Sequence, residues 1–239
     1  MIKDNENAIL QSKTIDFLRF YLIIWIVFIH IGIRVQDYGV GVKVVYDLFS
    51  QILSRVAVPL FFIISGYLFF LNKDEKGTFN KKTYTRKMKS RVKTLLVPYL
   101  IWNFMAIVYL LVLQSMNVDS SYFVYSKDVT SYTIKDFLLC FSYRAGDEPV
   151  LFQFWFLRDL ILICILSPIV YLLTKYLKFI PLLCFFLFWL IGNHTSKIVD
   201  LEGQTLCFFF LGAYLSINKK NMVDICKKFS FYSLILYLL

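Results

Sequence analysis

The chain has 239 residues, of which 59% are hydrophobic, 19% aromatic and only 18% charged. Soluble domains carry charge on about a quarter of their residues, so this composition excludes an ordinary soluble protein. Long apolar runs recur along the chain and predict an all-α fold, a polytopic transmembrane helical bundle. The net charge of +10 comes from basic residues clustered between these runs. That pattern is typical of cytoplasmic loops and predicts contact with membrane lipid, not with nucleic acid.

Hydropathy predicts six complete spans and a partial seventh. We expect them at about 17–33, 52–71, 95–113, 151–173, 176–192, 205–217 and, in part, 230–239. The segment 72–93 has nine Lys or Arg against two acids, whereas 115–149 has five acids against three bases. The positive-inside rule therefore predicts a cytoplasmic N-terminus and an outer location for 115–149. The last run is shorter than the ~20 residues of a crossing helix, so we expect 1–239 to be a single integral membrane domain that is truncated.

Local sequence features refine these expectations. Pro59 predicts a kink in the second span, and Ser65-Gly66 predicts a notch where another helix approaches closely. Lys178 and Pro181 interrupt the fifth span near its start. A segment around 131–144 is expected to form a short interfacial helix. The five cysteines show no CxxC spacing and indicate neither a disulfide framework nor a metal site.

Arg19 and His30 are ionisable residues within the first apolar segment, which reads RFYLIIWIVFIH over 19–30. Such groups are costly in hydrocarbon and are therefore candidate functional residues. At about 1.5 Å rise per residue, the imidazole lies about 16 Å along the helix from the guanidinium. His30 is either a structural hydrogen-bonding group or a general base for a hydroxyl. Arg19 is either an orientation signal at the cytoplasmic end of the span or a phosphate contact.

Two further groups of polar residues are candidates for binding. The basic run over 81–93 orients the chain, and its cations also suit the phosphates of a donor such as a coenzyme A thioester. The donor candidates are Arg86, Lys87 and Arg91. At the outer end of the fourth span, Trp155, Arg158 and Asp159 form either a neutralised interfacial anchor or the wall of a polar cavity for a carbohydrate.

Four motifs in order give the chain a resemblance to acyltransferase family 3, a family of membrane-bound acyltransferases. They are Asp16-Phe17-Leu18 with Arg19-x10-His30, PLFFIISGYLFF at 59–70, RVKTLLVPYLIW at 91–102 and WFLRDLIL at 155–162. Members are similar to bacterial O-acetyltransferases of cell-surface polysaccharides, lipopolysaccharide or peptidoglycan. Family members often have an Arg-x-x-Arg pair before the Pro-Tyr, and here Arg91-x-x-Thr94 departs from that pattern.

The resemblance implies a bundle of about ten transmembrane helices in the inner or plasma membrane of a bacterium. It implies transfer of an acyl group, usually acetyl, from cytoplasmic acyl-CoA to a hydroxyl of a cell-surface glycan or its lipid-linked precursor. Arg19 and His30 carry over as the essential pair. His30 is then the base or an acyl relay, and Arg19 positions it or the donor. Acetyl-CoA is implied as the donor substrate, with no metal.

Two alternatives of other classes stay open. The chain could be a non-catalytic transporter or export component for a glycan or a small polar solute, with its polar intramembrane residues lining a path. It could also be an inert or binding subunit. Dependence on acyl-CoA separates the enzyme from the transporter, because a transporter releases no free coenzyme thiol. A stable complex without turnover on blue-native gels would favour the inert or binding subunit. The sequence predicts no oligomeric state.

Overall fold

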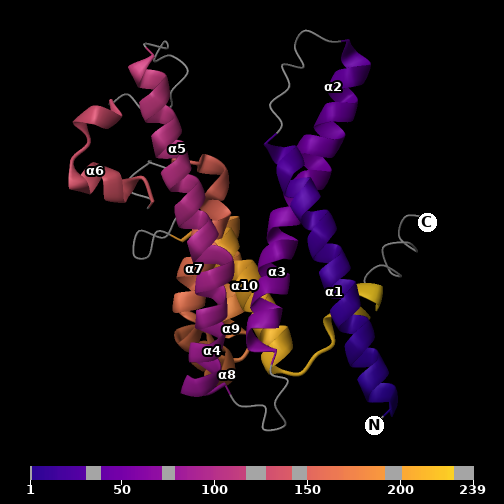
Figure 1. Cartoon of the computed structure of the whole chain (residues 1–239). Coiled ribbons are helices and arrows are strands. Elements are labelled where there is room, and N and C mark those ends of the chain that lie inside the picture. The colour runs from indigo at the N-terminus through magenta and orange to yellow at the C-terminus, as the bar shows by residue number, and fades with distance from the viewer. Residues whose placement is uncertain are drawn as a thin grey trace. The chain divides into compact units, whose positions relative to one another are not determined.

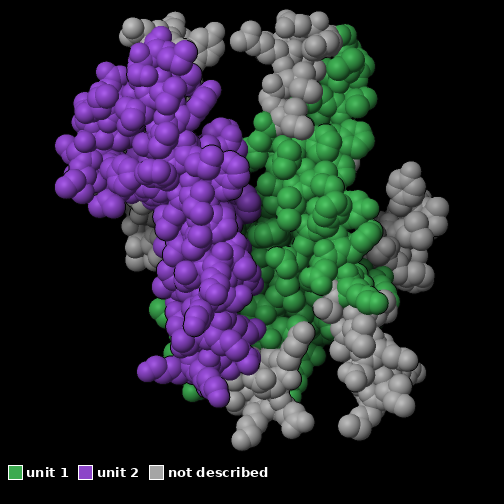
Figure 2. Space-filling model, viewed as in Figure 1, with its two compact units in different colours: residues 1–79, 167–194, 203–239 green, residues 80–166, 195–202 purple. Residues whose placement is uncertain are grey.

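The computed structural model describes residues 2–30, 39–71, 79–116, 128–141, 150–191 and 201–228. The regular elements in these ranges are all helices (Figure 1), which confirms the all-α class for the described part of the chain. The chain divides into two compact units (Figure 2). Unit 1 comprises residues 1–79, 167–194 and 203–239, and unit 2 comprises residues 80–166 and 195–202.

Unit 1 begins with α1, a single helix over Ile2–Ile29. The segment has neither proline nor glycine, so nothing in it breaks the helix. One stripe of α1 is buried, at Ile15, Leu22 and Ile26. The far side is equally apolar and exposed, at Phe17, Phe20 and Val27. A helix that is apolar on both its packed and its exposed side is typical of a membrane environment.

The second long helix of unit 1 covers Val40–Phe70, 31 residues in all. It consists of α2 (Val40–Tyr46), the π-helical η2 (Asp47–Leu53), the 3₁₀ turn η3 (Ser54–Val56) and α3 (Ala57–Phe70). It therefore begins well before the predicted span of 52–71. Pro59 lies just after the change from π to 3₁₀ winding, where its ring conflicts with the carbonyl four residues earlier. The irregular winding is confined to the residues before this proline.

The helices α3 and α10 (Gly203–Ile217) lie side by side in unit 1 (Figure 1). A Cβ atom on Gly66 would stand 2.3 Å from the carbonyl oxygen of Phe209, and one on Gly212 would stand 2.0 Å from that of Ile63. Neither position has room for a side chain. The predicted notch at Ser65-Gly66 is confirmed, and a second glycine on the partner helix completes it.

A polar contact ties three segments of unit 1 together at one end of α3. The Gln11 side-chain amide donates to the Tyr67 hydroxyl oxygen, and the Tyr67 hydroxyl donates to the backbone oxygen of Lys220 at 3.2 Å. The three residues lie on α1, on α3 and after α10. Because hydrogen bonds among apolar helices face little competition from water, this tie stabilises the packing of the bundle.

The remaining helices of unit 1 are short. They are α8 (Ser167–Leu177), α9 (Ile180–Leu190) and a helical segment over 222–228. Lys178 adopts a left-handed backbone conformation with φ of 54° between α8 and α9, and Pro181 opens α9. These are the two residues expected to interrupt the fifth span. The aromatic rings of Phe70, Phe79 and Tyr171 pack together beside α8, with centroids 5.0–6.4 Å apart.

Unit 2 is built on one 35-residue helix over Lys81–Ser115. It consists of α4 (Lys81–Arg91), the π-helical η4 (Val92–Leu96) and α5 (Val97–Ser115). The basic run 81–93, expected as part of a loop, is therefore helical, which corrects that expectation. Asn80 caps α4 by accepting the Thr83 backbone N–H at 2.9 Å, and the Lys, Arg and Met residues that follow are good helix formers.

The helix α7 (Trp155–Ile165), preceded by the 3₁₀ turn η7 (Phe152–Phe154), runs antiparallel to this long helix. The Tyr84 hydroxyl donates to the carbonyl of Ile165 at 3.2 Å, and Asn103 accepts the backbone N–H of Leu151 at 3.3 Å. Both ends of α7 are thus held. The short helix α6 (Ile134–Leu139), closed by a Thr133–Asp136 capping box, confirms that a helix forms within 131–144.

Two of the described helices, Val40–Phe70 and Lys81–Ser115, are long and apolar enough to cross a membrane. The helices Phe152–Ile165 and Ser167–Leu177 form a bent pair, which is a third candidate span if the two are counted together. Pro168 lies at this break, and it cannot donate the helical hydrogen bond there. The apolar helices α9 and α10 are shorter, and the predicted partial span at 230–239 lies outside the described residues.

The contact between α3 and α10 makes a prediction. Gly66→Ala and Gly212→Ala each force the two backbones apart, so we expect a lower melting temperature and a smaller folded yield in detergent. Gly41→Ala is the matched control, because a Cβ atom there meets nothing within 4 Å and alanine favours the helix by up to about 1 kcal/mol. Wild-type melting of Gly212→Ala would contradict the close approach of these helices.

Candidate active site

Arg19 and His30 lie on the same side of α1. Eleven residues turn the helix about 20° past three full turns, so the two positions fall on nearly one line. That line runs beside the buried stripe of Ile15, Leu22 and Ile26, and both side chains are half-buried. The guanidinium and the imidazole therefore lie at the edge of the packed side of the helix, between the buried stripe and the exposed Ile23.

His30 lies at the C-terminal end of α1, next to the π-helical segment η2. Its backbone N–H donates to Val27 at 3.0 Å, and the Ser50 hydroxyl donates to the carbonyl of Phe28 at 3.2 Å. An apolar cavity of about 450 Å³ opens beside this end, lined by Phe28 and by residues of α2 and η2, including Val45. The imidazole thus lies at the end of a helix whose position a neighbouring segment holds.

The three donor candidates on α4 do not share one face. Lys87 and Arg91 are four residues apart on the side of the helix that carries Tyr84, and both are half-buried. Arg86 is exposed, about 140° around the helix from Arg91. The helix therefore brings Lys87 and Arg91 together and separates Arg86 from them.

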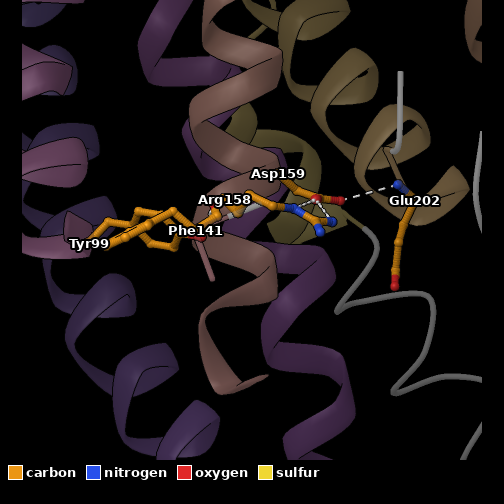
Figure 3. Close-up of polar contacts among 5 residues, drawn as sticks. All are labelled: Tyr99, Phe141, Arg158, Asp159 and Glu202. Carbon is orange, nitrogen blue, oxygen red and sulfur yellow. Dashed lines mark hydrogen bonds and ion pairs between the residues drawn. The ribbon is translucent and has the colours of Figure 1, made fainter. Parts of the chain in front are cut away.

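Arg158 and Asp159 form a buried ion pair on α7, with 6% and 0% of their surface exposed (Figure 3). One oxygen of Asp159 accepts from Nε of Arg158 at 3.0 Å and also from Nη2. The other accepts the backbone N–H of Glu202 at 3.2 Å. Figure 3 shows the Glu202 side chain directed away from the pair. The pair thus fastens the segment before α10 to α7.

Trp155 opens α7, one helical turn before Asp159, and is half-buried. Its ring packs edge-on to that of Phe156, with centroids 6.3 Å apart. Trp155 and Asp159 share a side of the helix because they are four residues apart. A role in binding a glycan stays a prediction for Trp155, Arg158 and Asp159.

Two polar residues of α5 that sequence reasoning did not single out support this region. Asn103 is fully buried, donates to Tyr99 of its own helix at 2.8 Å and accepts from Leu151. The Tyr99 hydroxyl donates to the carbonyl of Phe141 at 2.9 Å. An asparagine in the middle of an apolar run is itself a sequence signal, because an amide is costly in hydrocarbon unless it finds partners.

The candidate residues therefore form three groups. Arg19 and His30 belong to unit 1, whereas the cations of α4 and the polar residues of α7 belong to unit 2. Within unit 2, α4 packs against α7, and the Tyr84 hydroxyl of α4 donates to the carbonyl of Ile165 at the end of α7. The basic helix and α7 thus form one packed arrangement.

Comparison with known proteins places these residues in context. A family model described as an acyltransferase domain matches residues 12–239. Over 220 residues the chain is 29% identical to the succinoglycan biosynthesis protein ExoH of Rhizobium meliloti (strain 1021), covering 88% of this chain and 55% of that protein. The chain thus spans about half the length of the curated relative it matches.

No solved structure matches the chain. The family match covers nearly the whole chain, including Arg19 and His30 on α1, the basic helix α4 and the ion pair on α7. The resemblance inferred from the four motifs is confirmed at the level of the family. The chain belongs to the acyltransferase 3 family.

Proposed function

We propose that the chain is an integral membrane O-acyltransferase. It takes an acyl group, most often acetyl, from cytoplasmic acyl-CoA and passes it to a hydroxyl of a cell-surface glycan or its lipid-linked precursor. The observation that carries the proposal is that Arg19 and His30 lie on one line of α1, both half-buried at the edge of its packed side, in a chain of this family. The relationship to a succinoglycan biosynthesis protein supports a glycan as the acceptor.

The chemistry assigned to His30 is general base catalysis. The imidazole takes the proton of the acceptor hydroxyl as the hydroxyl oxygen bonds to the acyl carbon. The bond between that carbon and the coenzyme sulfur breaks, and the proton passes from the imidazolium to the departing thiolate. Arg19, about 16 Å away along the helix, is too distant to touch the same proton and is assigned to holding the donor or to orienting the helix end.

The orientation proposed for the chain follows from its charges. The nine basic residues of 72–93 support a cytoplasmic location for that segment and for the N-terminus. Arg19 then lies toward the cytoplasmic face, and His30 lies deeper in the membrane or beyond its middle. Cytoplasmic acyl-CoA would meet Lys87 and Arg91 at the basic end of the Lys81–Ser115 helix. We propose that six complete spans and a partial seventh make up this part of the enzyme.

The first prediction concerns His30. Removing a general base costs about 10²–10⁴-fold in rate, so His30→Ala should lower acyl transfer at least about hundredfold while the protein still inserts into membranes. The measurement is acyl-CoA-dependent labelling of glycan together with release of free coenzyme thiol. His194→Ala is the matched control, since His194 is the other histidine of the sequence. Undiminished transfer by His30→Ala would remove the imidazole from the mechanism.

The second prediction separates the cations of α4. A charge-assisted hydrogen bond contributes about 1.5–3 kcal/mol, so Arg91→Gln should raise the KM for acyl-CoA about tenfold or more. The exposed Arg86→Gln should raise it less, with an effect that fades as salt is added. Lys135→Gln on α6 serves as a control for the loss of one positive charge. Equal KM values for all three variants would argue against a donor site on this helix.

The third prediction tests whether the ion pair on α7 is structural. Asp159→Asn leaves the buried Arg158 guanidinium without a counter-charge, which costs about 3–5 kcal/mol when a buried pair is broken. We expect a clearly lower melting temperature, largely restored in the double variant Arg158→Met/Asp159→Asn. Unchanged melting with a raised KM for the acceptor glycan would instead assign the pair to substrate binding.

A further inference from the structure

The end of α1 that carries His30 is held by a contact that the proposed chemistry does not use. The last carbonyls of a helix have no partner within it. One of them, on Val27, accepts the backbone N–H of His30 at 3.0 Å. The next, on Phe28, accepts the hydroxyl of Ser50 at 3.2 Å, and Ser50 is 2% exposed. A buried side chain from another helix therefore binds the backbone two residues before the imidazole.

A second contact reaches the same end of α1 from the same neighbour. The rings of Trp25 and Phe49 are stacked, with centroids 5.9 Å apart and an interplanar angle of 9°. Phe49 and Ser50 are adjacent in sequence, and both belong to η2. One turn of helix thus supplies a ring contact to the last turns of α1 and a hydrogen bond to its terminal carbonyl.

The π winding of η2 makes this double contact possible. In a π turn, backbone hydrogen bonds span five residues, which adds a residue to the turn and shifts the side chains around the helix. Here the carbonyl of Phe49 accepts both the backbone N–H of Ser54 and, at 2.6 Å, the Ser54 hydroxyl. Ser54 is fully buried, so its hydroxyl holds the wide turn in place. π turns often lie at functional sites.

We propose that Ser50 is a positioning residue for His30. Its hydroxyl, presented by η2, sets the place of the last turn of α1 and with it the place of the imidazole. This inference rests on the proposed function of His30 as the base. A displacement of the reacting group by about 1 Å costs on the order of hundredfold in rate, so a single hydrogen bond to the helix end has a large effect on turnover.

The test compares three variants of the full chain. Ser50→Ala removes the hydroxyl, and Ser50→Thr keeps it. Ser115→Ala removes a hydroxyl whose hydrogen bond, among the described residues, is to Val112 of its own helix at 2.7 Å. We expect Ser50→Ala to lower the turnover number about tenfold to hundredfold with an unchanged KM for acyl-CoA. We expect Ser50→Thr to recover most of it, and Ser115→Ala to match wild type.

A spectroscopic measurement reports on His30 apart from activity. The sequence has two histidines, so a His194→Gln background leaves one imidazole for nuclear magnetic resonance in lipid nanodiscs. We expect Ser50→Ala to shift or split the His30 imidazole signal, Ser50→Thr to restore it and Ser115→Ala to leave it unmoved. If Ser50 only stabilised the fold, Ser50→Ala would lower the melting temperature without moving the His30 imidazole signal.

The outcomes separate the two proposals. An imidazole signal that Ser50→Ala leaves unmoved overturns the positioning role, whatever the turnover. Wild-type turnover in Ser50→Ala, in a chain that loses transfer in His30→Ala, overturns it as well. Full transfer by His30→Ala overturns the proposed function instead. In that case, a His30 imidazole signal that moves in Ser50→Ala still shows that Ser50 positions the imidazole.

Discussion

The close approach of α3 and α10 is the constraint on which unit 1 depends. In hydrocarbon the hydrophobic effect does not drive helices together, so their association relies on surfaces that fit closely. Gly66 and Gly212 let two backbones meet where any side chain would collide. Once these helices are fixed, Tyr67 on α3 reaches both Gln11 on α1 and the backbone after α10. The buried stripe of α1, beside which Arg19 and His30 lie, then packs toward α3, η2 and η3.

Unit 2 differs from unit 1 in that it buries several polar side chains among apolar helices. Asp159 and Asn103 are both fully buried, and each bonds a backbone N–H as well as a neighbour close in sequence. Burying polar groups is costly unless their hydrogen bonds are made, so these contacts dictate how the connecting segments meet the helices. The polar residues of this unit thus order the chain around α7 whether or not they also meet a substrate.

Part of this arrangement could be predicted from sequence alone. The Ser65-Gly66 notch was predictable because small residues have one clear use between membrane helices, and the family followed from four motifs. The helical winding of 81–91 was missed because its charges were interpreted only as a topology signal, although lysine and arginine favour helices. The hydrogen bond from the Glu202 backbone N–H to Asp159 joins residues 43 apart in the sequence. It could not be predicted, because a backbone donor leaves no pattern of side chains in the sequence.

The length of the Lys81–Ser115 helix has a mechanical consequence. At about 1.5 Å per residue it is about 52 Å long, whereas the hydrocarbon of a membrane is about 30 Å thick. If this helix crosses a membrane, it is longer than the hydrocarbon is thick, so its basic end extends into the water while Asn103 lies nearer the hydrocarbon. Lys87 and Asn103 are separated by about 24 Å of continuous helix. One helix, with the π-helical η4 in its middle, thus carries both the cations of α4 and the polar contacts of Asn103, so a tilt of this helix moves both groups together.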